Sequence, residues 1–274
     1  MGRRAGVKSR RVVLIGFGAI ASDIAAALLA ASEPGYALGV LLRPDSPSRP
    51  RVPDSCTALA SLDEVEAYAP DLVIEAAGHA AVRDSVPGCL ALGLPVLISS
   101  IGALHGEALL ADLVATARKG GGRLLLASGA LGGLDYVRAV RHATQLDLRY
   151  ESRKPPAAWS AELQRLGHDP ATLSQPVTLF SGTAREAAAL YPQNLNVAAA
   201  LALAGPGFEA TGVDVVCDPA ATGNMHVVTA SSEFGTMALT IANRPSPANP
   251  KSSWIVAQAL LAAVEQHFSP VVML

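Results

Sequence analysis

Residues 11–31, RVVLIGFGAIASDIAAALLAA, decide the fold of the first half of the chain. The β-branched run at 11–15 predicts a strand, and the alanine-rich segment that closes the stretch has the composition of a helix. Gly16, Gly18 and Ala21 join the two with the GxGxxA spacing of dinucleotide-binding turns. Gly16 permits the tight turn, Gly18 lets the backbone approach a pyrophosphate, and the small Ala21 lets the helix pack on the strand.

The start of this helix is the predicted binding site for the cofactor phosphates. Its first N–H groups lack partners within the helix, and the helix dipole places positive potential beside them. We assign cofactor contacts to four residues of the turn, Gly16, Gly18, Ala19 and Ile20. A glycine turn also joins strands to helices for structural reasons alone, so the assignment depends on the pattern of the later segments.

The segments after this helix alternate between strands and helices. Apolar runs predict strands at 36–43, 71–78, 94–100 and 123–128, with helices between them at 81–92, at 106–119 and after the capping box Ser61-Leu62-Asp63-Glu64. Strands separated by helices of this length form a parallel sheet with helices on both faces. We therefore predict an α/β fold in which residues 1–133 form a Rossmann domain with a doubly wound parallel sheet.

The end of the second predicted strand bears on the choice of cofactor. A carboxylate about 20 residues beyond the glycines would bind the ribose hydroxyls and favour NAD, whereas an arginine can accept a 2′-phosphate. Here the strand ends in Arg43-Pro44-Asp45, with Arg49 and Arg51 close behind. We assign Arg43 to the cofactor and predict NAD or NADP, with the preference left open. Arg49 and Arg51 suit a solvated Pro/Ser-rich loop equally well.

The composition of the whole chain favours a small-molecule partner. Its 274 residues suit two modest domains, and 21 Lys+Arg against 23 Asp+Glu leave no strong field to attract nucleic acid or anionic lipid. The basic, apolar N-terminus has some features of a secretory signal, but glycines interrupt it and it is too short to span a bilayer. Cys56, Cys89 and Cys217 lie far apart, so we predict reduced thiols in a cytoplasmic protein and no metal site.

The pattern changes in the second half of the chain. Residues 224–230 and 236–242 predict a hairpin around SSEFG, and strands joined by tight turns indicate a mixed or antiparallel sheet. We predict an α+β substrate and catalytic domain in residues 134–248. The last segment, 249–274, predicts an apolar helix with Asn249 as its N-cap, which we expect to return to the Rossmann domain.

Several motifs of this chain together resemble the NAD(P)-dependent L-aspartate dehydrogenases. They cover most of the sequence in the same order, and the combination of NLNVAA, GNMH and SPANPKSS is far more specific than a glycine turn. The motifs are GFGAIA, SSIGAL, GGGRLLLASGALGGLD, SRKPP, YPQNLNVAAALALAG, GNMHVV and NRPSPANPKSS. Arg43 departs from the pattern, because an acidic residue might be expected there, and this puts strict NAD specificity in doubt.

The resemblance implies an activity and a set of site residues. The activity is reversible oxidative deamination of L-aspartate to iminoaspartate, or to oxaloacetate and ammonia, in an enzyme of pyridine nucleotide biosynthesis that forms a homodimer. The family's active-site histidine falls on His226, and its cofactor contacts fall on the backbone amide of Ala130 and on Asn196. Without the resemblance, His226 would more often be a structural histidine held by a backbone carbonyl. A catalytic histidine would titrate near neutrality.

The substrate carboxylates also need cations or amide donors. Asn194 and Lys251 are our candidates, although Asn194 is equally well explained as a helix N-cap. Arg153, Lys154 and Arg244 are further cations that the sequence cannot separate from solvated surface charges. Two other functions stay open: a reductase of another imine or keto acid, similar to dihydrodipicolinate reductase, or a dinucleotide-binding protein without catalysis.

Overall fold

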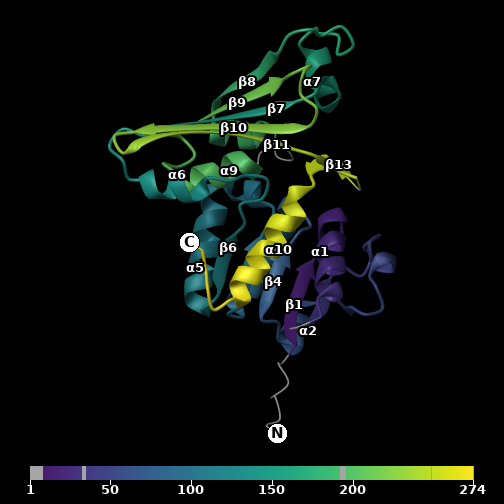
Figure 1. The fold of residues 1–274 in the computed structure, drawn as a ribbon. Helices are drawn as coiled ribbons and strands as arrows, with labels where there is room; N and C mark the ends of the chain where they lie inside the picture. Colours follow the sequence, from purple (N-terminus) through teal and green to yellow (C-terminus); the bar gives the residue numbers. More distant parts are fainter. Residues whose placement is uncertain (1–8, 33–34, 192–195, 248, 274) are drawn as a thin grey trace. The chain divides into compact units, whose positions relative to one another are not determined.

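The computed structural model describes residues 9–32, 35–191, 196–247 and 249–273 and falls into two compact units (Figure 1). The first unit extends to Ala127 and includes Leu260–Val272, and the second holds Ser128–Ala259. The side chains of Pro250 and Lys251 are not among the described atoms.

The first unit is built on six parallel strands. Their order is β3-β2-β1-β4-β5-β6, which is the strand order of a doubly wound dinucleotide fold and confirms the predicted Rossmann sheet. The short strand β3 was not predicted. The strands are β1 (Arg10–Ile15), β2 (Tyr36–Leu41), β3 (Thr57–Leu59), β4 (Leu72–Glu75), β5 (Pro95–Ile98) and β6 (Arg123–Leu126).

Helices follow most of these strands. They are α1 (Ala19–Ala30), α2 (Leu62–Tyr68), α3 (His79–Asp84), α4 (Val86–Ala91) and α5 (Glu107–Gly120), with 3₁₀ turns η1 (Arg49–Arg51) and η2 (Ile101–His105). The predicted cap is present, because Ser61 Oγ accepts from the Glu64 N–H at the start of α2. The single helix predicted at 81–92 is two helices, because Pro87 lacks an N–H and disfavours a helical conformation at the residue before it.

The second unit holds the predicted mixed sheet. Its order is β11-β10-β7-β9-β8, in which β7 and β9 run parallel and the other pairs are antiparallel. The predicted hairpin is confirmed as β10 (Asn224–Ser232) and β11 (Gly235–Asn243). The other elements up to β9 are α6 (Leu134–Val140), β7 (Asp147–Lys154), η3 (Pro156–Trp159), α7 (Ser160–Arg165), β8 (Val177–Thr183), α8 (Ala184–Leu190), α9 (Asn196–Ala204) and β9 (Thr211–Cys217).

The last helix begins later than predicted. Residues Asn249–Ser253 form strand β13, which pairs with β12 (Pro245–Ser246), and helix α10 spans Ile255–Phe268. Asn249 therefore does not cap the helix, and its Nδ2 donates instead to Ser252 Oγ at 3.1 Å. The end of α10 packs within the first unit, where the Phe268 ring meets Tyr36 edge-on with centroids 6.1 Å apart.

Two properties of the described ranges bear on the class of protein. None of the helices in this part of the chain combines the length and apolar character needed to cross a membrane. The same residues contain no group of three or more His, Cys, Asp or Glu side chains arranged to hold a metal ion. Cys56, Cys89 and Cys217 are buried free cysteines.

Candidate active site

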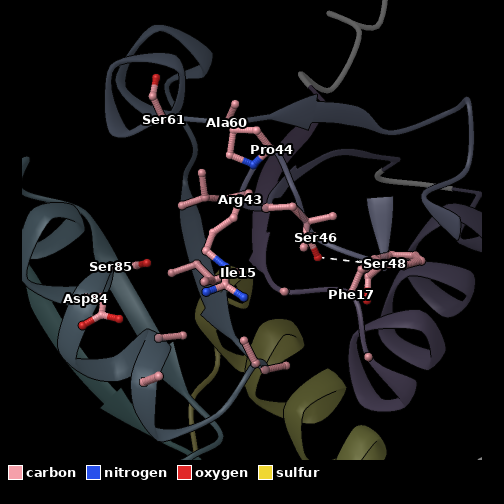
Figure 2. A pocket seen from close by; sticks show the side chains of 18 of the residues that line it. Ile15, Phe17, Arg43, Pro44, Ser46, Ser48, Ala60, Ser61, Asp84 and Ser85 are labelled. Carbon is pink, nitrogen blue, oxygen red and sulfur yellow. Dashed lines mark hydrogen bonds between the residues drawn. The ribbon is translucent and has the colours of Figure 1, made fainter. Parts of the chain in front are cut away.

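A pocket of about 510 Å³ lies in the first unit, at the carboxyl ends of β1, β2 and β4. Ligands bind at this edge of doubly wound sheets, on either side of the point where the strand order reverses. The volume is within the usual range for small-molecule sites. Its lining includes Gly16, Gly18 and Ala77, together with Phe17, Arg43, Ser46, Ser48, Asp84 and Ser85, which are labelled in Figure 2.

The two glycines of the turn have different tasks. Gly16 has a φ of +89°, and a Cβ there would lie 2.5 Å from Ala77 Cβ, so only glycine fits. Gly18 has an ordinary φ of −85°, and a Cβ there would meet nothing within 4 Å. The absent side chain of Gly18 therefore leaves room for a ligand in the pocket. Ala19 and Ile20 form the first turn of α1, where N–H groups lack helical partners.

Arg51 and Arg43 both follow β2 and are both exposed, but they make different contacts. Arg51 Nη2 donates to the Phe17 carbonyl at 3.0 Å and to Ser48 Oγ at 2.7 Å, so it braces the glycine turn. Arg51 is exposed in a 3₁₀ turn of this loop, so it is a solvated loop residue that also makes these two contacts. Arg43 lines the pocket with a side chain that is 84% exposed, and its Nε lies 3.9 Å from Asp45 Oδ1. Figure 2 shows the Arg43 guanidinium turned into the pocket.

A buried carboxylate fixes the loop after β4, which lines one side of this pocket. Glu75, the last residue of β4, is 0% exposed. Its Oε1 accepts from the N–H groups of Ala77 and Gly78 at 2.8 and 2.7 Å and from Ser100 Oγ at 3.0 Å. Its Oε2 accepts from the Ser100 N–H at 3.0 Å. Glu75 therefore ties the loop after β4, which packs on Gly16, to the loop after β5.

Glu75→Gln is expected to weaken cofactor binding about tenfold and to lower the melting temperature. The new amide turns one acceptor into a donor that faces other donors, and such a mismatch costs about 1–3 kcal/mol. Titration of the reduced cofactor and thermal unfolding would measure both effects. Glu66→Gln, the same change on an exposed residue of α2, is the control and should alter neither. Unchanged affinity in Glu75→Gln would show that the two loops keep their positions without the carboxylate.

In the second unit, His226 lies on β10 with its side chain turned to the buried face of the sheet. Only 4% of the residue is exposed, and its Nδ1 lies 2.8 Å from the hydroxyl of Tyr150 on neighbouring strand β7. Its Nε2 is buried and has no hydrogen-bond partner among the described residues. A purely structural histidine would normally have both ring nitrogens satisfied, so the unsatisfied Nε2 favours a role toward a ligand.

The charge state of His226 is set by its surroundings. Burial, with the nearby Lys154 ammonium adding to it, lowers the pKa of His226 to about 4. The imidazole is therefore neutral at pH 7, which corrects the expectation of titration near neutrality. Burial also lowers the pKa of Lys154 to about 8 and raises the pKa of the Tyr150 phenol, which stays protonated. A neutral His226 can accept a proton without first losing one.

The structure places two further predicted cofactor residues in the second unit. Ala130 lies in the turn after β6, where its carbonyl accepts from Asn243 Nδ2 at 2.8 Å. Asn196 is exposed at the first position of α9. Asn194 lies outside the described residues, and so does the side chain of Lys251, although Lys251 itself belongs to β13. Nothing in the structure therefore places Asn194 or the ammonium of Lys251.

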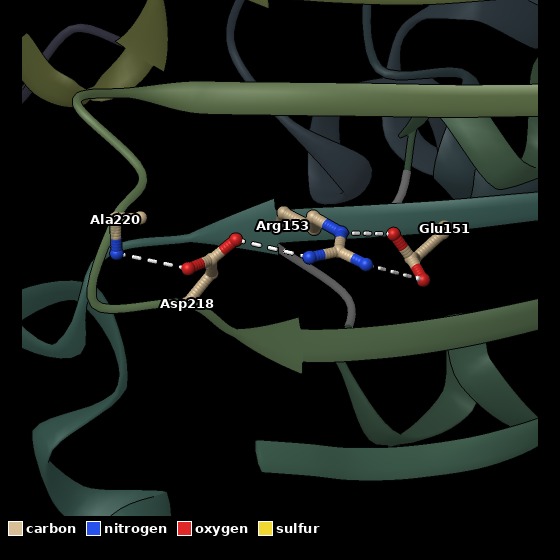
Figure 3. A network of polar contacts seen from close by, with 4 residues as sticks. All are labelled: Glu151, Arg153, Asp218 and Ala220. Carbon is tan, nitrogen blue, oxygen red and sulfur yellow. Dashed lines mark hydrogen bonds and ion pairs between the residues drawn. The ribbon is translucent and has the colours of Figure 1, made fainter. Parts of the chain in front are cut away.

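Arg153 is occupied by carboxylates. It pairs with Glu151 on the same strand, and its Nη1 donates to Asp218 Oδ2 at 3.0 Å (Figure 3). Asp218 is held in turn by the Ala220 N–H at 2.8 Å. These two carboxylates raise the pKa of Arg153. The charge of Arg153, a candidate for binding the substrate carboxylates, is therefore balanced by carboxylates of the protein itself.

Sequence reasoning missed Glu75, Tyr150 and Trp159. A signal existed for the first, because a single carboxylate in the apolar run DLVIEAAG is rare unless it is hydrogen-bonded. A weaker signal existed for the second, because alternation along YESRK places Tyr150, Ser152 and Lys154 on one face. For Trp159 the sequence held no signal beyond the residue type itself.

Comparisons with known proteins cover both units. A family model described as aspartate dehydrogenase, C-terminal, matches residues 135–267, and one described as homoserine dehydrogenase, NAD binding domain, matches 16–127. L-aspartate dehydrogenase 2 of Bordetella bronchiseptica is 48% identical over 95% of this chain and 98% of that protein. L-aspartate dehydrogenase of Ruegeria pomeroyi is 41% identical over 94% and 92%. The crystal structure of aspartate dehydrogenase from Thermotoga maritima matches with a TM-score of 0.76 at 25% identity, over 97% of this chain and 100% of that one.

Proposed function

The chain belongs to the L-aspartate dehydrogenase family, and on that premise we propose that it catalyses the reversible NAD(P)-dependent oxidative deamination of L-aspartate. The products are iminoaspartate and, after hydration, oxaloacetate and ammonia. The observation that carries the proposal is a buried histidine of the second unit with one ring nitrogen left for a ligand, in a chain whose first unit has a dinucleotide pocket.

The residues of the first unit fit a dinucleotide. The Gly18 position is open, the start of α1 supplies unpaired N–H groups, and Arg51 and Glu75 hold the surrounding loops. A dinucleotide held by these residues would supply the hydride-transfer chemistry of the reaction. The protein then has to bind the dicarboxylate, orient it and manage the protons of the ammonium and of water.

We assign the proton work to His226. In the tautomer with a proton on Nδ1, the ring donates to the Tyr150 hydroxyl, and the Nε2 lone pair is available for a substrate proton. Its pKa of about 4 keeps this lone pair free throughout the neutral range. Tyr150 then acts as a positioning residue that fixes the ring and its tautomer. In the reverse direction the protonated ring can deliver the proton to the imine.

A spectrophotometric assay tests the proposal directly. The purified protein should reduce NAD or NADP with L-aspartate and oxidise the reduced cofactor with oxaloacetate and ammonia. A panel with L-alanine, L-homoserine, dihydrodipicolinate and other keto acids separates the alternatives, because a reductase of another imine would prefer one of those substrates. Cofactor binding without turnover of any substrate would contradict the enzymatic proposal.

We assign Arg43 to the adenosine end of the cofactor, where its exposed guanidinium can pair with a 2′-phosphate. Arg43→Asp should lower the NADP/NAD ratio of kcat/KM about tenfold or more, because a charge-assisted pair of about 1.5–3 kcal/mol is replaced by repulsion. The ratio is measured by varying each cofactor at saturating L-aspartate. Arg43→Ala removes the attraction without adding repulsion and should give an intermediate ratio. The same ratio in all three proteins would remove Arg43 from cofactor selection.

We further infer a cytoplasmic enzyme that works as a homodimer in pyridine nucleotide biosynthesis. Buried free thiols at Cys56, Cys89 and Cys217 support a reducing compartment. The homodimer and the pathway rest on the family resemblance. Sedimentation of the purified protein would test the dimer.

A further inference from the structure

Buried polar side chains of β7 share one face of the second sheet with His226 of β10. Side chains alternate along β7, so Tyr150, Ser152 and Lys154 share the buried face while Arg153 is on the other. Ser152 is 0% and Lys154 5% exposed, and Ser152 is the direct neighbour of His226 across the strand pair. Trp159, which follows β7 in η3, is 1% exposed.

Three atoms of this group have no hydrogen-bond partner within the described part of the chain. They are Ser152 Oγ, Trp159 Nε1 and His226 Nε2, and all three are buried. The Ser152 hydroxyl approaches that of Tyr150 without making a hydrogen bond of good geometry. Buried polar atoms almost always have partners, and several exceptions in one group indicate that a ligand supplies them.

The chemistry of these atoms selects the ligand. An ammonium and an indole N–H can only donate hydrogen bonds, so their ligand must be an acceptor. Lys154 Nζ lies 5.3 Å from the centroid of the Trp159 ring. The positive charge of Lys154 also helps to lower the pKa of His226. A buried positive charge beside unpaired donors favours an anion, and a carboxylate is an anion that only accepts.

We propose that Lys154, Trp159 and Ser152 bind one carboxylate of the dicarboxylate substrate beside His226. The identity of the ligand as aspartate or oxaloacetate rests on the proposed function, whereas the preference for a carboxylate rests on the donors themselves. Lys154 is distinguished from the other candidate cations by its burial, because the Arg153 side chain is 30% exposed and Arg244 is exposed. Lys154 is the buried cation next to the proposed proton acceptor.

The two tryptophans of the chain allow a binding test that does not need turnover. Trp254 is 48% exposed, and Trp254→Phe leaves the buried Trp159 as the single tryptophan, which can be excited selectively at the red edge of the absorption band. Titration of this variant with succinate, in the presence of saturating oxidised cofactor, should give a saturable change in emission as the indole N–H gains an acceptor. Adding Lys154→Met should raise the Kd for succinate about 10- to 100-fold, and Lys154→Arg in its place should restore much of the affinity.

Steady-state kinetics give an independent measurement. Lys154→Met should raise KM for L-aspartate and oxaloacetate by a larger factor than it lowers kcat. Trp159→Phe keeps an aromatic ring against Tyr191 but removes the indole N–H together with the five-membered ring, so a rise in KM at an unchanged melting temperature supports the subsite even if Lys154→Met does not fold. Lys119→Met, on the exposed end of α5, is the matched control and should change neither constant.

The outcomes separate this proposal from the proposed function. The subsite would be overturned if Lys154→Met did not change the Kd for succinate. It would also be overturned if succinate did not change the emission of Trp159 in a protein that turns over aspartate. Succinate binding that depends on Lys154 in a protein that does not oxidise aspartate would support the subsite and contradict the dehydrogenase activity.

Discussion

His226→Asn is expected to lower kcat for L-aspartate oxidation by about 10²–10⁴-fold, which is the usual contribution of a general acid–base group. Asparagine keeps a polar side chain that can still meet the Tyr150 hydroxyl, but it cannot take up a proton. Cofactor affinity should be unchanged, because His226 does not line the dinucleotide pocket and is assigned to the substrate. The melting temperature should fall by a few degrees at most, since at most one hydrogen bond of about 1 kcal/mol is lost.

The acid limb of the pH profile adds a second measurement. Because the folded-state pKa of His226 is lowered to about 4, the free enzyme should lose kcat/KM only as the pH falls toward that value. The unfolded chain binds this proton at a higher pH, so wild-type stability should decrease by about 3 kcal/mol between roughly pH 6.5 and 4, a loss absent in His226→Asn. His142→Asn, at an exposed turn, is the control. A near wild-type kcat in His226→Asn would make the histidine structural.

Gly18→Val should abolish tight cofactor binding, with a Kd at least about 100-fold higher, while the fold remains. The added side chain meets no protein atom within 4 Å and the backbone angles suit any residue, so folding is not opposed. It projects instead toward the place where amides at the start of α1 would hold the pyrophosphate. Losing two charge-assisted hydrogen bonds there costs about 3 kcal/mol or more, which is about two powers of ten in Kd.

Gly106→Val is the matched control for this change. Gly106 is also an N-cap glycine with an extended backbone and open space at the Cβ position, but it does not line the pocket. Calorimetric titration with the reduced cofactor should show wild-type affinity for this control. Gly16→Val should instead unfold the protein at lower temperature, because its φ is positive and Ala77 blocks the Cβ. Tight cofactor binding by Gly18→Val would mean that the phosphates lie elsewhere.

The fold was predictable wherever the signal was local. The turn at Gly16 and Gly18, the alternation of strands and helices, and the hairpin each depend on neighbouring residues, and the structure confirms them. Short elements with weak patterns were missed, such as the three-residue β3. The start of the last helix was wrong because Asn249-Pro250 is a good helix start, yet the backbone there pairs with β12.

The candidate site was predictable only in part, because its chemistry depends on distant neighbours. Glu75 acquires its role from Ser100 on another loop, and no local pattern joins those residues. Sequence could suggest that His226 titrates near neutrality, whereas the lowered pKa comes from burial and from Lys154 on another strand. Likewise, no sequence pattern showed that Arg153 pairs with carboxylates of the protein, or that its neighbour Lys154 is buried.

The discontinuity of the first unit affects the order in which the protein can fold during synthesis. Arg10 Nη2 donates to the Phe268 carbonyl at 3.4 Å, a contact between residues 258 positions apart, and the Arg10 guanidinium also lies over the Phe268 ring. The ribosome therefore releases the whole second unit, which is continuous from Ser128 to Ala259, before the segment that completes the first. Until α10 has been synthesised, the surface of the Rossmann sheet that α10 covers stays exposed. A chaperone can bind this surface during that interval.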